Sequence, residues 1–265
     1  MSKIIIEIDG PLGIVTLNNP EKHNAFDDAF IAELTSAFQT LDVNPAVRVV
    51  ILSAAGKSFS AGADLNWMKR MAEYSPEENL RDAKALALLM STLHSLSKPT
   101  IARVQGAALG GGVGLVACCD MAVGMQTVAF SLSEAKLGLI PAVISPYVIA
   151  AIGERAAHRY FLTAEKFDAA EAFRLGLLHE LAVDDDAMDE KINDLVTALL
   201  ACSPNAITEG KRLIAAVANH PVNRELIDDT AERIARVRAS DEGKEGVRAF
   251  LEKRKAKWVV EDKKD

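Results

Sequence analysis

The chain contains a run of glycines, Leu109-Gly110-Gly111-Gly112-Val113-Gly114-Leu115, between an apolar segment over 100–104 and a second apolar segment over 115–119. The run predicts a junction at which a buried strand ends and a helix begins. Because glycine has no Cβ, a reacting group can approach this backbone closely, and N–H groups stay accessible at the helix N-terminus. The junction therefore indicates where a negatively charged oxygen could bind.

Strand and helix patterns alternate along the first two thirds of the chain. Apolar runs over 47–52 and 100–104 indicate buried strands, and residues 27–41 carry apolar side chains at helical spacing. This alternation predicts an α/β fold, in which helices cover parallel strands. We further expect a hairpin over 4–17, a long helix over 65–96, and short strands over 121–123, 128–132 and 181–183.

The last third of the chain has a different composition, with alanine, glutamate and arginine at helical period over 188–200, 204–217 and 224–238. We therefore predict an α/β core over residues 1–185 and a helical region over residues 186–265.

The composition predicts a cytoplasmic protein. No apolar run reaches the roughly 18 residues that a membrane-spanning helix needs, and the N-terminus is too short and acidic for a secretory signal. The net charge of −7 over 265 residues argues against a nucleic-acid partner. Three cysteines cannot all pair, and we interpret them as small core residues; no histidine has the spacing of a metal ligand, so no metal is expected.

Three segments could carry chemistry. Besides the glycine run, Phe59–Leu65 contains small residues at a second junction, and Phe130–Pro141 places Glu134 at a strand end in apolar surroundings. Two such junctions could bring two N–H donors to one oxygen, as an enolate requires. A desolvated Glu134 would have a raised pKa, which suits a general acid or base. Structural roles remain open: tight packing for the glycines, helix capping for Asp64, and a salt bridge to Lys136 for Glu134.

Other active-site motifs fit the sequence poorly. A dinucleotide-binding fingerprint would need a third glycine where Leu115 stands, and the Lys-Ser/Thr ending of a phosphate-binding loop is absent. A serine hydrolase on a similar core would need a Gly-x-Ser-x-Gly turn or a convincing Ser/His/Asp set, and neither is present.

Ser60-Ala61-Gly62-Ala63-Asp64-Leu65, Gly106–Gly112 and the segment around Glu134 together resemble the crotonase family of enoyl-CoA hydratases and isomerases, from Ile4 to about Trp258. The resemblance implies a spiral of ββα units with a C-terminal helical trimerisation region, a homotrimer or dimer of trimers, and an acyl-CoA substrate without a separate cofactor. It implies that Glu134 is the catalytic acid/base and that the N–H groups of Ala63 and Gly111 form an oxyanion hole. It places Lys22, Ala25, Ala61, Asp64 and Leu65 at the CoA, and Trp67, Met68, Gly114, Pro141 and Val143 around the acyl group.

One feature of the sequence narrows the expected substrate class, and another leaves the expected reaction open. Gly62–Met68 and Pro141–Pro146 resemble bacterial 3-methylglutaconyl-CoA and carboxygeranoyl-CoA hydratases. However, many family hydratases carry a second glutamate where this chain has Gly114, whereas family isomerases work with one. We interpret Gly114 as opening room beside the β-carbon, where a carboxylate of the substrate, held by Lys69, Arg70 or Lys136, compensates for the missing acid.

The sequence thus predicts an enoyl-CoA hydratase that adds water across the α,β double bond of a thioester. Two alternatives stay open: an isomerase that uses one glutamate, and a non-catalytic relative that binds acyl-CoA or RNA.

Overall fold

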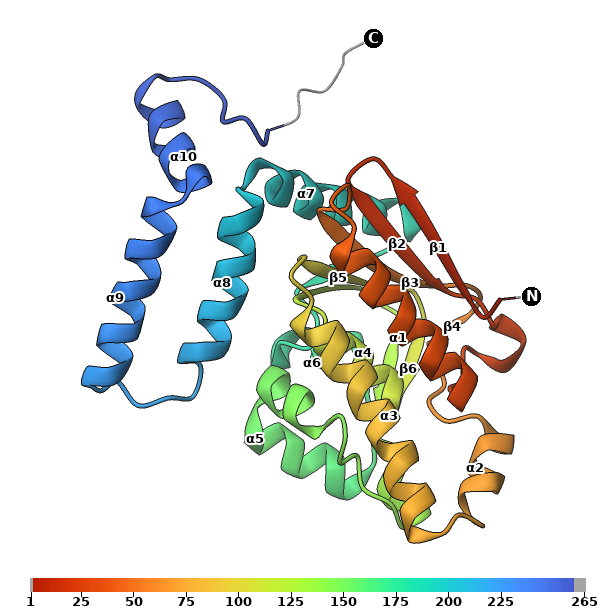
Figure 1. Cartoon of the computed structure of the whole chain (residues 1–265). Helices are drawn as coiled ribbons and strands as arrows, with labels where there is room; N and C mark the ends of the chain where they lie inside the picture. Colours follow the sequence, from red (N-terminus) through yellow and green to blue (C-terminus); the bar gives the residue numbers. More distant parts are fainter. Residues whose placement is uncertain (1, 260–265) are drawn as a thin grey trace. The chain divides into compact units, whose positions relative to one another are not determined.

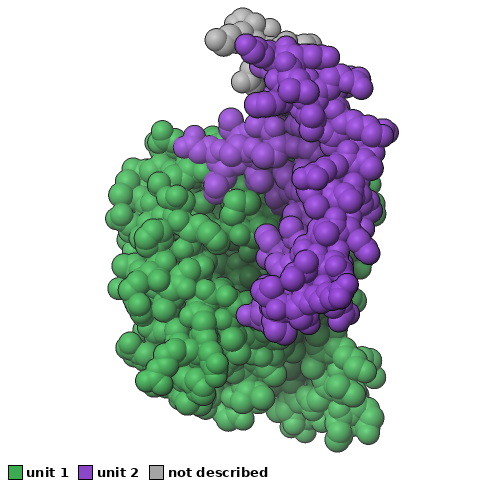
Figure 2. Space-filling view, turned by 90° about the vertical axis from the view of Figure 1, so that its left-hand side faces the viewer, with its two compact units in different colours: residues 1–96, 100–193 green, residues 97–99, 194–265 purple. Residues whose placement is uncertain are grey.

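The computed structural model describes residues 2–259, and the chain divides into two compact units. Unit 1 comprises residues 1–96 and 100–193, and unit 2 comprises residues 97–99 and 194–265 (Figure 2). The division falls inside one helix, α7 (Asp185–Ala201), so the two units share that helix.

Unit 1 is built on a six-stranded sheet with the strand order β1-β2-β3-β5-β7-β10. Figure 1 labels β1, β2, β3 and β5 of this sheet. A hairpin of β1 (Ile4–Asp9) and β2 (Leu12–Leu17) forms one edge, and the other pairings are parallel. The remaining strands are β3 (Val49–Ala54), β5 (Thr100–Val104), β7 (Met121–Met125) and β10 (Glu180–Ala182). The predicted hairpin and the apolar parallel strands are confirmed.

A second, four-stranded sheet has the order β4-β6-β8-β9. Its strands are β4 (Ser58–Ser60), β6 (Ala107–Leu109), β8 (Ala129–Ser131) and β9 (Lys166–Asp168). Each of the first three follows a strand of the large sheet and precedes a helical segment, which repeats a ββα unit three times along the chain. The α/β fold with repeated ββα units is therefore confirmed. Three-residue strands carry no alternating pattern, and the sequence analysis missed β4, β6 and β9.

The helices of unit 1 are α1 (Asp28–Val43), α2 (Leu65–Met71), α3 (Pro76–Ser95), α4 (Gly111–Cys118), α5 (Ser145–Thr163) and α6 (Ala169–Leu175), with short 3₁₀ helices η1 (Pro20–Lys22) and η2 (Ser133–Leu137). The single helix predicted over 65–96 is wrong, because α2 and α3 are separate. Ser75 caps α3 in a complete capping box with Glu78, and Pro76 stands in its first turn, where its fixed φ favours a new helix start.

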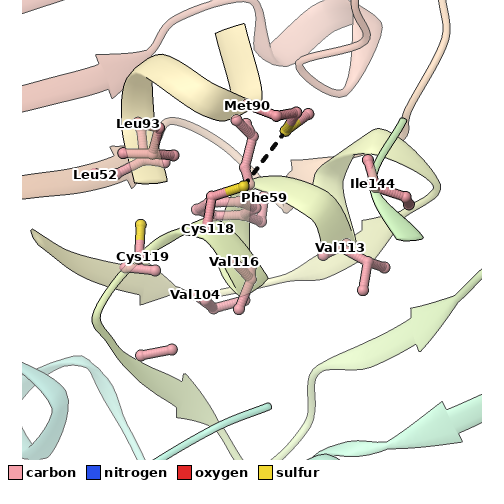
Figure 3. Packing of buried hydrophobic residues seen from close by; sticks show 14 of the residues in the cluster. Leu52, Phe59, Met90, Leu93, Val104, Val113, Val116, Cys118, Cys119 and Ile144 are labelled. Atoms are coloured by element: carbon pink, nitrogen blue, oxygen red, sulfur yellow. Dashed lines mark hydrogen bonds between the residues drawn. The ribbon is translucent and has the colours of Figure 1, made fainter. Parts of the chain in front are cut away.

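The core of unit 1 lies between the large sheet and the helices, where α1 packs against α3 and α3 against α4. Figure 3 shows part of it: Met90, Val113 and Ile144 lie among buried side chains around α4, and Met90 Sδ is 3.8 Å from Cys118 Sγ. Cys118 and Cys119 are buried, as predicted for small core residues, whereas Cys202 is exposed, so the core prediction is wrong for that residue.

Unit 2 contains α8 (Pro204–Val217), α9 (Arg224–Ala239) and α10 (Asp241–Leu251) as well as the end of α7, so the predicted C-terminal helices are present. Thr208 Oγ1 donates to Ser97 O at 2.9 Å and Lys211 Nζ to Lys98 O at 3.0 Å, which attaches residues 97–99 to α8. Trp258 Nε1 donates to Ala201 O at 3.1 Å and joins the end of the described chain to α7.

Candidate active site

Three chain segments leave the small sheet at one edge. β6 lies between β4 and β8 and runs parallel to both, with Leu109 opposite Ser131. The carboxyl ends of parallel strands meet at one edge, so residues 61–64, 110–112 and 132–134 follow neighbouring strands there. Gly110 N donates to Ser131 O at 2.8 Å, and an ideal Cβ at Gly62 would lie 2.9 Å from Leu109 O. The structure thus brings together the three segments that the sequence singled out.

The first segment is fixed by Phe26, which forms an isolated parallel bridge with Ala63. Phe26 N donates to Gly62 O at 2.6 Å, and Asp64 N donates to Phe26 O at 2.8 Å. Because the bridge uses the polar groups of residues 62 and 64, the N–H of Ala63 points away from Phe26. Within residues 2–259, no acceptor pairs with that N–H. Ala63 therefore offers a free main-chain donor.

The second segment begins α4. Gly110 is its N-cap residue with φ +50° and ψ −119°, a conformation that favours glycine. Gly111 is the first helical residue, and its N–H has no acceptor among the described residues. An ideal Cβ at Gly111 would lie 2.6 Å from Phe26 Cε2, so glycine is required for this close packing. Phe26 thus contacts both donor segments, which the sequence analysis did not foresee.

The third segment carries Glu134, in η2. Its Oε1 lies 3.1 Å from the position of an ideal Cβ on Gly110, beside the start of α4. Its Oε2 is buried and has no hydrogen-bond partner among the described residues, so the salt bridge to Lys136 considered above is not formed. Burial raises the pKa of the Glu134 carboxyl above its ordinary value of 4.5. A half-buried carboxylate with an unused oxygen is suited to exchanging protons with a bound molecule.

The residues predicted to contact CoA lie together around residues 61–65. Lys22 Nζ donates to Asp64 Oδ2 at 3.0 Å, and Ala61 N donates to the carbonyl of His23 at 2.9 Å. Ala25 is buried next to them, and Leu65 is 74% exposed at the start of α2. Asp64 also caps α2, accepting from Asn66 N at 2.8 Å and Trp67 N at 3.1 Å. The capping role considered for Asp64 is therefore present in the structure, and Lys22 lowers the pKa of its carboxyl.

The residues predicted for the acyl pocket have different surroundings. Trp67 is buried, with Nε1 donating to Asp82 Oδ1 at 3.1 Å; Met68 is half-buried. Pro141 is buried and Val143 packs partly against the core.

The room predicted beside Gly114 is not open, which corrects that interpretation. An ideal Cβ at Gly114 would lie 2.3 Å from Ile144 Cγ2 and 3.3 Å from Met90 Cε. Ile144 therefore fills the space that the glycine leaves. The sequence could not show which of the side chains after Pro141 reaches α4.

Within residues 2–259, no three potential ligands gather in a metal-binding cluster, and no helix is long and apolar enough to cross a membrane.

The fold thus repeats ββα units and brings two main-chain N–H donors and a half-buried carboxylate to one sheet edge. The sequence profile of the enoyl-CoA hydratase/isomerase family matches residues 7–261, and this chain belongs to that family, also called the crotonase family.

Solved structures and a sequence relative agree with this assignment. An enoyl-CoA hydratase from Shewanella pealeana is 45% identical, with a TM-score of 0.94 over 97% of this chain and 96% of that one. An enoyl-CoA hydratase/isomerase from Marinobacter aquaeolei is 32% identical, with a TM-score of 0.91 over 97% and 99%. The enoyl-CoA hydratase ACTT6 of Alternaria alternata is 34% identical over 238 residues, 89% of this chain and 77% of that protein.

Proposed function

We propose that this protein adds water across the α,β double bond of an enoyl-CoA thioester. The observation that carries the proposal is Oε2 of Glu134, which has no hydrogen-bond partner within residues 2–259 and belongs to a carboxylate beside the N-terminus of α4. In this scheme the thioester oxygen accepts hydrogen bonds from Ala63 N–H and Gly111 N–H, which stabilise the charge that develops on it. Two relatives named as enoyl-CoA hydratases, from Shewanella pealeana and Alternaria alternata, support the same reaction.

The proton balance follows from the single carboxylate. Ionised Glu134 accepts a proton from water while the water oxygen bonds to the β-carbon, and an enolate forms. The resulting carboxylic acid then gives a proton to the α-carbon, which restores the carboxylate and completes a syn addition. No oxidant or reductant is consumed, so the scheme needs no cofactor beyond the CoA of the substrate.

The test compares Glu134→Gln with the parent. Glu134→Gln should abolish hydration of crotonyl-CoA, followed by loss of the enoyl absorbance, and should keep the affinity for butyryl-CoA, measured by calorimetry. Glu154→Gln is the matched control, because Glu154 lies on α5 with its side chain 85% exposed. Thioester binding by a parent without turnover would instead identify a non-catalytic acyl-CoA-binding protein, and RNA binding by that parent would favour the RNA-binding alternative.

An isomerase is the second candidate, because an aliphatic side chain, Ile144, occupies the space beside Gly114 where a second carboxylate would otherwise project. Moving a double bond needs only one base to carry a proton between two carbons. Reactions run in ¹⁸O-labelled water separate the two candidates: hydration places the label on the β-carbon, whereas isomerisation leaves the product unlabelled.

The substrate class that we favour is a carboxylated or branched enoyl-CoA such as 3-methylglutaconyl-CoA, on the motif resemblance of Gly62–Met68 and Pro141–Pro146. Of the cations considered for a substrate carboxylate, Arg70 is paired with Asp28 at 2.6 Å, whereas Lys69 and Lys136 are exposed on α2 and η2. Comparable kcat/KM values for 3-methylglutaconyl-CoA and crotonyl-CoA would contradict a compensating carboxylate.

We also propose that the C-terminal helices assemble the chain into trimers or dimers of trimers. Large apolar side chains are exposed on these helices, among them Ile227 at 56%, Ile234 at 48% and Phe250 at 81%. Exposed apolar surface of this kind favours burial against another chain. Light scattering measures the mass directly, and a monomer at micromolar concentration would refute the assembly.

A further inference from the structure

Two glycines contact the segments that cover the start of α4. Gly110 and Gly114 are four residues apart, and Gly114 N donates to Gly110 O at 3.3 Å. Gly110 is the N-cap residue, with φ +50° and ψ −119°, and Gly114 lies inside the helix, which begins at Gly111. An ideal Cβ at Gly110 would meet Glu134 Oε1 at 3.1 Å, and one at Gly114 would meet Ile144 Cγ2 at 2.3 Å. Glu134 therefore lies against the N-cap residue of α4, and Ile144 lies against the residue that is hydrogen-bonded to it.

Ile144 is held rigidly in this place. It is the N-cap residue of α5, its carbonyl accepts from Val148 N at 3.0 Å, and the residue is only 3% exposed. A β-branched side chain has few accessible rotamers, so it cannot easily swing away from α4. The Ile144 side chain thus forms a fixed apolar boundary, referred to below as the wall, beside the helix turn that follows the Glu134 carboxylate.

We propose that Ile144 is a specificity-determining residue that limits the size of the acyl group, by closing the side of the site that Gly114 leaves bare. The proposal rests on the proposed function, which places the thioester oxygen at Gly111 N–H. The acyl carbons then start at the first turn of α4, and a chain that extends along the helix meets Ile144 within one turn, about 5.4 Å. Short or compact acyl groups fit in front of this wall, and longer apolar ones do not.

The test measures a ratio of two substrates, so that a general loss of stability or activity cancels. The ratio is kcat/KM for 2-hexenoyl-CoA divided by kcat/KM for crotonyl-CoA, in the parent, Ile144→Val and Ile144→Ala. One methylene in an apolar pocket changes discrimination by about 10- to 200-fold. We expect Ile144→Ala to raise the ratio at least about tenfold, and Ile144→Val, which loses one methyl, to raise it less.

Ile152→Ala is the matched control. Ile152 is also on α5 and buried, at 5% exposed, but it is not among the atoms nearest Gly114. Its truncation should lower stability without changing the ratio. An unchanged ratio in Ile144→Ala, or an equal rise in Ile152→Ala, would overturn the proposal. If Ile144→Ala does not fold, the ratio in Ile144→Val decides.

A binding measurement keeps this test separate from the test of the proposed reaction. Calorimetry with the saturated thioesters hexanoyl-CoA and butyryl-CoA needs no turnover. If the parent binds both without hydrating any enoyl-CoA, the proposed reaction fails, and the size limit stands or falls on whether Ile144→Ala tightens hexanoyl-CoA relative to butyryl-CoA. A parent that binds neither thioester overturns both proposals.

Discussion

Replacing Asp64 by alanine removes two kinds of interaction at the entrance of α2. The carboxylate caps the helix through Asn66 N and Trp67 N, at 2.8 and 3.1 Å, and it pairs with Lys22 at 3.0 Å. Loss of an N-cap costs about 1 kcal/mol. The ion pair is partly exposed, since the Lys22 side chain is 50% accessible, and is worth about 0.5 kcal/mol, while burial of the aspartate adds to its value. We therefore expect Asp64→Ala to lose about 2 kcal/mol.

Thermal denaturation followed by circular dichroism measures this loss. For a folded unit of this size, about 2 kcal/mol corresponds to a fall in Tm of about 4–8 °C. Asp64→Asn keeps a capping oxygen and loses only the charge, so its Tm should fall by about 1–2 °C. Asp168→Ala is the matched control, because Asp168 caps α6 by accepting from Glu171 N at 2.8 Å. The fall in Tm for Asp168→Ala should lie between the falls for Asp64→Asn and Asp64→Ala.

The stabilisation by the Asp64 charge depends on pH, and the direction of the Asp64 pKa shift gives the sign of this dependence. Lys22 lowers the pKa of Asp64 in the folded state, so the stabilisation by the charge is present above the unfolded pKa of about 3.9 and is lost as the pH falls through the folded pKa. The Tm difference between the parent and Asp64→Asn should thus shrink below pH 4. Equal Tm losses for Asp64→Asn and Asp64→Ala, or a difference that persists in acid, would refute the reasoning.

Three further predictions concern other parts of the site. The rising limb of kcat/KM against pH should have its midpoint above the ordinary glutamate value of 4.5, because burial raises the pKa of Glu134 and the base form is needed; a midpoint at or below 4.5 would contradict this role. Gly112→Ala should lose about 1–3 kcal/mol in urea denaturation, since its Cβ would lie 2.8 Å from Ser60 O, whereas Gly210→Ala in open surroundings should not destabilise α8. Asn24→Ala should lose about 3 kcal/mol, measured in the same way, because the buried amide makes three hydrogen bonds, at 2.8, 2.9 and 2.9 Å, whose partners would be left unpaired.

Much of the fold could be predicted from local patterns. The apolar runs of β3, β5 and β7 each fill a buried strand, and the residues of α1 repeat at helical spacing. The small sheet could not be predicted in the same way, because Ser58–Ser60 and Ala107–Leu109 become strands only by pairing with segments that are distant in sequence. The break between α2 and α3 could have been predicted, since Ser75, Pro76 and Glu78 form a typical helix start. The helical spacing that continues across residues 65–96 hid this signal.

The residues of the candidate site also differ in whether the sequence could single them out. Gly111 and Glu134 could be singled out because their own neighbours in sequence, glycines and apolar residues, define their surroundings. Phe26 and Ile144 could not, because each acts through contact with residues of α4 that are distant in sequence. Their importance depends on which segments the fold brings together, and a single sequence does not state that.

The two donors at the sheet edge are main-chain groups, whereas the proposed proton carrier is one side chain. This difference has an evolutionary consequence. A single codon change at position 134 would remove the chemistry and leave the peptide N–H groups of Ala63 and Gly111 in place. Under the proposed function, a descendant with that change would still hold a thioester in the same orientation, and selection could keep it as a carrier or sensor of acyl-CoA without any change in its backbone.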